Sequence, residues 1–116
     1  MVAKSTGIGK AFNKKRAKLG KLEYVMFSGK FAKHTNRAHD DIDILIVGDV
    51  VQAEVSMLIQ QEEKVREREI NYTIFSSEEF EFRKQRRDPF LLEQLSGSRI
   101  MVIGDEEELV ARKAQV

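Results

Sequence analysis

The stretch DIDILIVG, residues 41–48, decides the fold of this 116-residue chain. After the second aspartate its apolar residues follow one another without interruption, a pattern typical of a strand that is covered on both faces. Asp41 and Asp43 lie at its start, and side chains at positions i and i+2 of a strand project from the same face. We therefore predict a buried strand over 41–47 that carries two neighbouring carboxylates at one end.

Three further apolar runs are rich in β-forming residues and have the length of strands. They predict strands over residues 24–28, 69–75 and 99–103. Only about a dozen residues separate the first of these from the strand over 41–47. Because that connection is too short for a crossover helix, these two strands are expected to be antiparallel.

Helices are predicted between and around the strands. Asp49 is the expected N-cap of a helix over 50–66, with Gln52 in the capping-box position. This helix would pack through one apolar face, formed by Val51, Val55, Leu58 and Ile59, while its charged tail, residues 60–68, would face water. Further helices are expected over 9–19 and after the capping residues Ser76, Asp88 and Asp105. The predicted fold class is α/β (α+β), with a small mixed sheet of about four strands and helices packed on it.

The composition is that of a soluble globular protein, since 41% of the residues are hydrophobic and 34% are charged. No apolar run approaches the ~18 residues that a membrane-spanning helix needs. The chain has no cysteine, which excludes disulfides, thiolate zinc sites and cysteine nucleophiles. These features fit a cytoplasmic protein that does not associate with a membrane.

Positive charge is concentrated near the N-terminus. Residues 1–33 hold nine Lys or Arg and a single acid, whereas the other 83 residues hold 11 basic and 18 acidic residues. We divide the chain into a basic N-terminal segment, residues 1–21, with a loose start and a short helix, and a domain over residues 22–116. The basic residues 10–21 can bind nucleic acid or can form a solvated surface.

The two aspartates at the start of the strand need a cation nearby, because like charges at that distance resist joint ionisation. Mg²⁺ fits this need, since it takes oxygen ligands and keeps bound waters for a phosphate substrate. The alternative is that Asp41 and Asp43 lie at an exposed strand entrance, paired with Arg37 or Lys33. The Asp-x-Asp pattern alone favours this alternative, because the pattern is short and common.

The residues upstream change this balance. The run VMFSGKFAK, residues 25–33, ends an apolar strand at a glycine turn, and the Asp-x-Asp strand starts twelve residues after Gly29. This arrangement resembles the signature of minimal nucleotidyltransferases of the DNA polymerase β-like superfamily, and the resemblance covers residues 24–104. It implies that Asp41 and Asp43 are catalytic and hold Mg²⁺ or Mn²⁺. It also implies a binding site for the NTP triphosphate at Ser28, Gly29, Lys30 and Lys33.

The site departs from the family pattern at several positions. Lys30 stands where the family has a serine after the glycine, and the serine of this chain, Ser28, precedes the glycine. Lys33 occupies the position of an arginine. The third metal-binding carboxylate of active members aligns with Asn71, which is a neutral ligand, and Glu69, two positions earlier on the same face, is the alternative third ligand.

These departures leave three functions open. The first is Mg²⁺-dependent transfer of a nucleoside monophosphate from an NTP to an acceptor. The second is a nucleotide-binding or regulatory module that keeps the fold without turnover. The third is a subunit that works only with a protein partner, as small members of this family pair with an all-helical protein in toxin–antitoxin systems. Six apolar residues are expected in the core or, where the sheet cannot cover them, at a homodimer or partner surface: Phe80, Phe82, Phe90, Leu91, Leu92 and Leu95.

Overall fold

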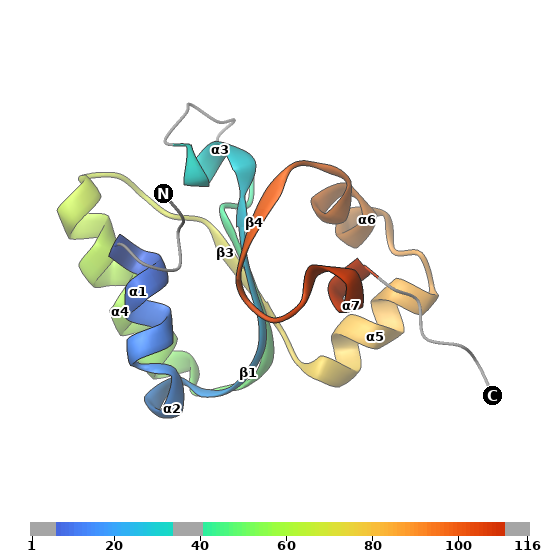
Figure 1. Cartoon of the computed structure of the whole chain (residues 1–116), viewed down its shortest axis with the longest axis horizontal. Helices are drawn as coiled ribbons and strands as arrows, with labels where there is room; N and C mark the ends of the chain where they lie inside the picture. The colour runs from blue at the N-terminus through green and yellow to red at the C-terminus, as the bar shows by residue number, and fades with distance from the viewer. Residues whose placement is uncertain (1–6, 34–40, 111–116) are drawn as a thin grey trace.

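In the computed structural model, which describes residues 7–33 and 41–110, a four-stranded sheet lies between two layers of helices (Figure 1). The strands are β1 (Gly20–Ser28), β2 (Ile44–Val50), β3 (Tyr72–Phe75) and β4 (Arg99–Ile103). Their order in the sheet is β3-β2-β1-β4. β1 pairs antiparallel with β2 and with β4, whereas β2 and β3 are parallel. The predicted small mixed sheet and the antiparallel pairing of the first two strands are therefore confirmed.

The helices form one layer on each face of the sheet (Figure 1). One layer contains α1 (Gly7–Lys14), α2 (Arg16–Leu19) and α4 (Gln52–Arg66), and the other contains α5 (Ser77–Gln85), α6 (Pro89–Ser96) and α7 (Glu106–Val110). The short helix α3 (Gly29–Ala32) lies at one end of the sheet, directly after β1. No helix in the described part of the chain has the length and apolar character that a membrane crossing requires.

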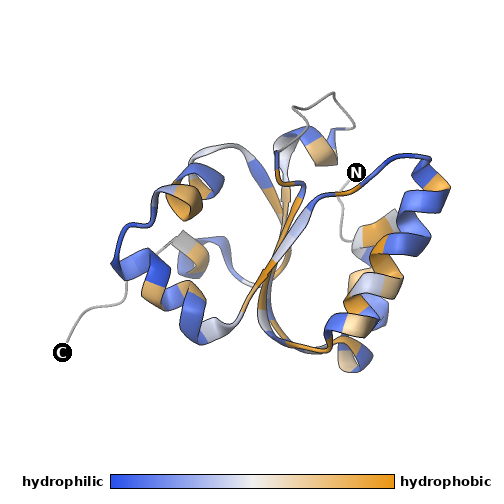
Figure 2. Cartoon of the chain, turned by 180° about the vertical axis from the view of Figure 1, so that it is seen from behind, coloured by the Kyte–Doolittle hydropathy of each residue, from blue (hydrophilic) through white to orange (hydrophobic). Residues whose placement is uncertain are grey.

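The apolar runs of β1 and β2 serve two separate cores. Val25 and Ile46 belong to the core under α1 and α4, whereas Met26 and Leu45 belong to the core under α5, α6 and α7. Figure 2 shows this arrangement as largely hydrophobic strands between helices that contain both hydrophilic and hydrophobic residues. The uninterrupted apolar pattern of residues 44–47 is thus explained by a strand with both faces covered.

The first helix that the structure describes contributes apolar side chains to the first core. Ile8 and Phe12 are buried one helical turn apart on α1, and the ring of Phe12 lies 6.2 Å from that of Phe27 in an edge-on arrangement. The prediction of one helix over 9–19 is corrected to two helices, α1 and α2. α1 begins at Gly7, inside a segment expected to be loose, because the burial of Ile8 favours an earlier start.

Both central strands have different ends from those predicted. β1 begins at Gly20 rather than at residue 24, and β2 covers Ile44–Val50 rather than 41–47. The cause is that residues 20–22 pair with residues 48–50 and extend the β1–β2 ladder at that end. Gly48 has a φ of 147°, and a Cβ added there would lie 2.1 Å from the carbonyl oxygen of Lys21, so only glycine fits.

The predicted start of α4 is wrong in its details. Asp49 pairs with Lys21 in the sheet, and the N-cap position is taken by Val51, which makes no side-chain capping bond. Val51 is also exposed, whereas the other three residues of the predicted apolar face are buried. The expected capping box at Asp49 fails because the strand continues through this residue.

Two later helix starts are confirmed. The hydroxyl of Ser76 accepts a hydrogen bond of 3.0 Å from the N–H of Glu79 at the start of α5. The carboxylate of Asp88 accepts one of 3.1 Å from the N–H of Leu91, with Pro89 in the first turn of α6. These caps satisfy amide groups that have no partner within their own helix.

Candidate functional site

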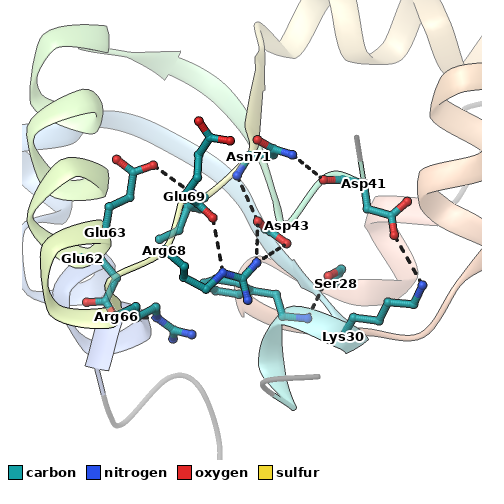
Figure 3. Close-up of polar contacts among 12 residues, drawn as sticks. Ser28, Lys30, Asp41, Asp43, Glu62, Glu63, Arg66, Arg68, Glu69 and Asn71 are labelled. Carbon is teal, nitrogen blue, oxygen red and sulfur yellow. Dashed lines mark hydrogen bonds and ion pairs between the residues drawn. The ribbon is translucent and has the colours of Figure 1, made fainter. Parts of the chain in front are cut away.

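The candidate site lies where β1 ends and β2 begins (Figure 3). The N–H of Ser28 donates a hydrogen bond of 2.9 Å to the carbonyl oxygen of Asp43, so the glycine turn and the aspartate segment are neighbours. The loop that precedes β3 reaches the same place, because the N–H of Asp43 donates to the carbonyl oxygen of Asn71 at 2.8 Å. The fold therefore gathers most of the predicted site residues: Ser28, Gly29, Lys30, Asp41, Asp43 and Asn71.

Asp41 and Asp43 lie just before β2 and not within it. The prediction that they share one strand face is therefore corrected. The side chain of Asp43 is fully buried, whereas that of Asp41 is 40% exposed. In Figure 3 the two carboxylates face different cations, with Asp41 turned toward Lys30 and Asp43 toward Arg68.

The Asp43 carboxylate has two kinds of donor. Its Oδ2 accepts 3.0 Å from the main-chain N–H of Asn71 and 3.3 Å from Nη2 of Arg68, and the same Nη2 lies 3.5 Å from Oδ1. Since Asp43 also donates its own N–H to Asn71, the two residues are joined in both directions. This exchange continues the contact between β2 and β3 past Ile44, where regular strand pairing ends. The buried carboxylate therefore anchors the loop before β3.

Asp41 has a weaker attachment through its side chain. Its Oδ2 lies 3.4 Å from Nζ of Lys30, and both side chains are well exposed to solvent. An ion pair of this kind contributes little to stability, because water already solvates both charges. The main chain is held more firmly, since Nδ2 of Asn71 donates to the Asp41 carbonyl oxygen at 3.0 Å.

Among the described residues, the ion pairs of the two aspartates are made by Lys30 and Arg68. The interpretation as an exposed strand entrance named Arg37 or Lys33 as partners. Arg37 lies outside the described residues. Lys33 is exposed at the C-terminal end of α3.

Asn71 and Glu69, the candidates for a third metal ligand, are placed differently. The Asn71 amide donates to Asp41 and its main chain contacts Asp43, so this residue lies at the centre of the site. Glu69 is exposed, and Figure 3 shows its carboxylate directed away from Asp43. The predicted strand over 69–75 begins only at Tyr72, because the N–H groups of Ile70 and Asn71 donate to the side chains of Glu63 and Asp43.

The Ser28-Gly29 turn has a clear structural basis. The Ser28 hydroxyl accepts a hydrogen bond of 3.1 Å from the N–H of Phe31 and caps α3. The N–H of Gly29 donates to the carbonyl oxygen of Ser98 at 2.9 Å. A Cβ at position 29 would lie 2.0 Å from the Ser98 hydroxyl, so glycine permits the close approach of β1 to the start of β4.

Arg68 is the main residue of the site that the sequence did not reveal. It belongs to the charged tail that was expected to face water, yet its side chain is only 30% exposed, and that of Arg66 only 16%. Both guanidinium groups lie near the buried ring of Phe31, at 4.3 Å from the ring centre for Arg66 and 5.8 Å for Arg68. The available signal was a pair of arginines two residues apart at the end of α4. Such a pair looks the same in the sequence as arginines in an ordinary charged tail that faces water.

The side chains of the site do not fit a divalent metal ion as they are arranged. Asp41 and Asp43 are both paired with protein cations, and Nδ2 of Asn71 donates to the main-chain carbonyl oxygen of Asp41. Within the residues that the structure describes, no three His, Cys, Asp or Glu side chains form a group that could hold a metal. A cation bound at Asp43 would have to displace the guanidinium of Arg68. The binding of Mg²⁺ or Mn²⁺ therefore stays a prediction that would require rearrangement of this site.

The architecture defines the fold of the chain. A four-stranded mixed sheet, with a glycine turn after the first strand and two aspartates immediately before the second, gives the chain a nucleotidyltransferase-like fold. The chain matches no protein-family model and no curated protein.

Among solved structures, the chain is similar to one in the crystal structure of a mutant toxin–antitoxin MntA–HpeT. The TM-score is 0.52 with 14% sequence identity, and the match covers 90% of this chain and 82% of that chain. The crystallised protein carries two aspartate-to-glutamate substitutions two positions apart. At this level of identity the similarity shows a common fold.

Proposed function

We propose that this chain is a nucleotidyltransferase-like module that acts by binding a protein partner and does not transfer nucleotides by itself. The observation that carries this proposal is the state of Asp43. Its carboxylate is fully buried and is shared between Arg68 and the main chain of Asn71. A residue held in this way supports the loop before β3, and it is not available to bind a metal without loss of those contacts.

The charges around the two aspartates support the same proposal. Lys30 and Arg68 supply two positive charges to two carboxylates, and the third ligand position is the neutral Asn71. Two-metal phosphoryl transfer needs enough negative charge to hold both cations. Because this site is already balanced by protein side chains, it has little electrostatic demand for divalent cations.

The role of a partner is inferred from the fold and from the missing catalytic charge. The structurally similar chain comes from a toxin–antitoxin, MntA–HpeT. We infer an antitoxin-like or regulatory role for the present chain, exerted in the cytoplasm on a partner protein. Co-expression with a candidate all-helical partner protein tests this role, since a stable complex should co-elute from size exclusion, and separate elution of the two folded proteins would contradict it.

The retained layout of the site favours a second candidate function. The glycine turn lies against the aspartate segment through the hydrogen bond from Ser28 to Asp43, as a nucleotide site requires. The chain would then bind an NTP through Ser28, Gly29, Lys30 and Lys33, and Asp41 and Asp43 would hold Mg²⁺ or Mn²⁺ and serve catalysis. Nucleic acid bound by the basic residues 10–21 would be one class of acceptor.

Labelled NTPs distinguish the two candidates. The wild-type chain is incubated with each labelled NTP and Mg²⁺ or Mn²⁺, with and without the co-expressed partner, and incorporation into protein or nucleic acid is measured. We expect no incorporation above that of Asp41→Asn, the matched variant that removes one exposed carboxylate. Incorporation at an ordinary enzymatic rate that Asp41→Asn abolishes would establish the transferase and overturn the proposal.

A further inference from the structure

Helix α5 carries its charges in two separate blocks. Its first turn contains Glu78 and Glu79, and basic residues follow its midpoint, ending with Arg86 at the C-cap. The aromatic residue Phe82 lies between the two blocks, four residues after Glu78 and four residues before Arg86. α5 belongs to the helical layer opposite to α4, at the outside of the molecule (Figure 1).

The inner and outer faces of α5 are clearly different. Phe80 and Lys84, one turn apart, are buried, and Nζ of Lys84 donates to the carbonyl oxygen of Leu109 at 3.0 Å. Phe82 lies on the opposite side of the helix and is 56% exposed. Glu78 and Arg86 flank it at the helical spacing of four residues and are also exposed. Within the described part of the chain, neither of these two flanking residues forms an ion pair.

We propose that the outer face of α5 binds the same face of a second copy of this chain, with the two helices antiparallel about a twofold axis at Phe82. A twofold interface makes every contact twice: if residue i of the first copy contacts residue j of the second, residue j of the first also contacts residue i of the second. Glu78 and Arg86 are each four residues from Phe82, so they lie about 6 Å along the helix on opposite sides of the twofold axis. Glu78 of each copy therefore meets Arg86 of the other, and the two Phe82 rings meet at the centre.

The charge pattern favours a second copy over a different partner. The outer face has an acid, an aromatic ring and a base in a row, so the face is complementary to itself only when reversed. The guanidinium of Arg86 lies 5.2 Å from the centre of the Phe82 ring, which keeps this basic end beside the aromatic residue. An acidic or a basic partner would match only one half of the face.

A pocket beside Phe82 gives the ring of the second copy a place to insert. It has a volume of about 290 Å³ and is lined by Glu79, Phe82, Arg83, Arg86, Asp88 and Pro89. Arg83 is held at the wall of this pocket by ion pairs of 3.0 Å to Glu79 and 3.3 Å to Asp88. These two ion pairs favour the observed position of Arg83 before the second copy binds, which lowers the cost of ordering this side chain at the interface.

The contact area of one nine-residue helix is small, so the dimer is expected to be weak and concentration-dependent. Sedimentation equilibrium of the full chain over a wide concentration range measures the dissociation constant. We expect Phe82→Ala to weaken dimerisation by at least about tenfold, because aromatic residues at the centre of an interface contribute most of the binding energy. Added salt should also weaken the dimer, since the paired charges are at its rim.

Charge reversal provides the decisive test. Glu78→Arg and Arg86→Glu each place like charges opposite one another at both ends of the interface, so each variant alone should be monomeric. An equal mixture of the two variants places opposite charges at both ends of the interface and should form a heterodimer. The dimeric fraction should reach at least about half of that of the wild type at the same total concentration. Lys64→Glu, on the exposed surface of α4 in the other layer, is the matched control and should dimerise like the wild type.

Circular dichroism of each variant confirms that it is folded, which is expected because the substituted side chains are exposed. A wild-type chain that stays monomeric at all concentrations would overturn the inference, as would a mixture of the two variants that stays monomeric. A dimer that Lys64→Glu disrupts, while Arg86→Glu does not, would place the interface elsewhere. None of these results depends on whether the chain transfers nucleotides or binds another protein.

Discussion

The carboxylate of Asp43 is fully buried, whereas that of Asp41, two residues earlier in the chain, is 40% exposed. Asp43 receives hydrogen bonds from a main-chain N–H and from a guanidinium that packs near Phe31, whereas Asp41 pairs with the exposed side chain of Lys30. The same residue type therefore supports the fold at one position and lies at the surface at the other. The two carboxylates therefore have different surroundings, whereas two ligands of one metal ion would both face that ion.

The largest effect is expected from removal of Asp43. Asp43→Ala should lower the free energy of unfolding by about 3 kcal/mol, because it leaves Arg68 and the N–H of Asn71 without their buried acceptor. Urea denaturation of the variant and of Asp41→Ala measures the difference. A loss that is the same for both aspartates would remove the distinction between them.

A smaller loss of stability is expected from removal of Arg68, the cation that pairs with Asp43. Arg68→Gln should cost about 2 kcal/mol, less than Asp43→Ala, because the N–H of Asn71 still donates to Asp43. Any Mg²⁺ bound in place of the guanidinium would raise the urea midpoint of the variant as its concentration increases. Lys64→Gln, at an exposed position, is the control for loss of one positive charge and should have little effect in either measurement.

Asn71→Asp tests the third ligand position. The substitution replaces an amide that donates to the Asp41 carbonyl oxygen by a carboxylate that cannot donate, which should cost about 1 kcal/mol. The added charge should also strengthen binding of Mn²⁺ measured by calorimetry. Glu69→Gln, which removes an exposed carboxylate nearby, should leave Mn²⁺ binding unchanged; if it abolishes binding instead, Glu69 is the third ligand.

The smallest effect is expected at the surface pair. Lys30→Ser and Asp41→Asn should each change the free energy of unfolding by less than about 0.5 kcal/mol, because both side chains of this ion pair are solvated. The same urea denaturation measures it. A cost above about 1 kcal/mol would show that Asp41 is as integral to the fold as Asp43.

The sequence was most informative where local and tertiary requirements agree. The uninterrupted apolar residues 44–47 predicted a strand with two covered faces, and the structure divides their side chains between two cores. β4 occupies the predicted residues 99–103. The Ser76 and Asp88 caps were identified because their hydrogen bonds are made within a few residues of the same chain segment.

The sequence was less informative where the deciding contact is distant. Arg68 pairs with a residue 25 positions earlier, and nothing within its own charged run distinguishes it from a solvated arginine. This distant contact is what separates the surroundings of Asp43 from those of Asp41. In the sequence, the two aspartates appeared equivalent because they are two residues apart in one strand pattern. Ser28 and Gly29 were identified from their motif, but the close approach of Ser98 that explains the glycine comes from the other edge of the sheet.

The central claim is that protein cations, and not a divalent metal, balance the two aspartates. The most direct measurement is a Mn²⁺ titration of the wild-type chain and of K30S/R68Q/N71D, followed by the paramagnetic broadening of the amide signals of residues 41–44. Arg68→Gln alone, which keeps the other contacts, serves in place of the triple variant if that protein unfolds. In the wild type these signals should broaden no earlier than that of the exposed Glu107, and in the variant they should broaden at a Mn²⁺ concentration at least about tenfold lower. Early broadening at residues 41–44 of the wild type, with no gain in the variant, would contradict the account.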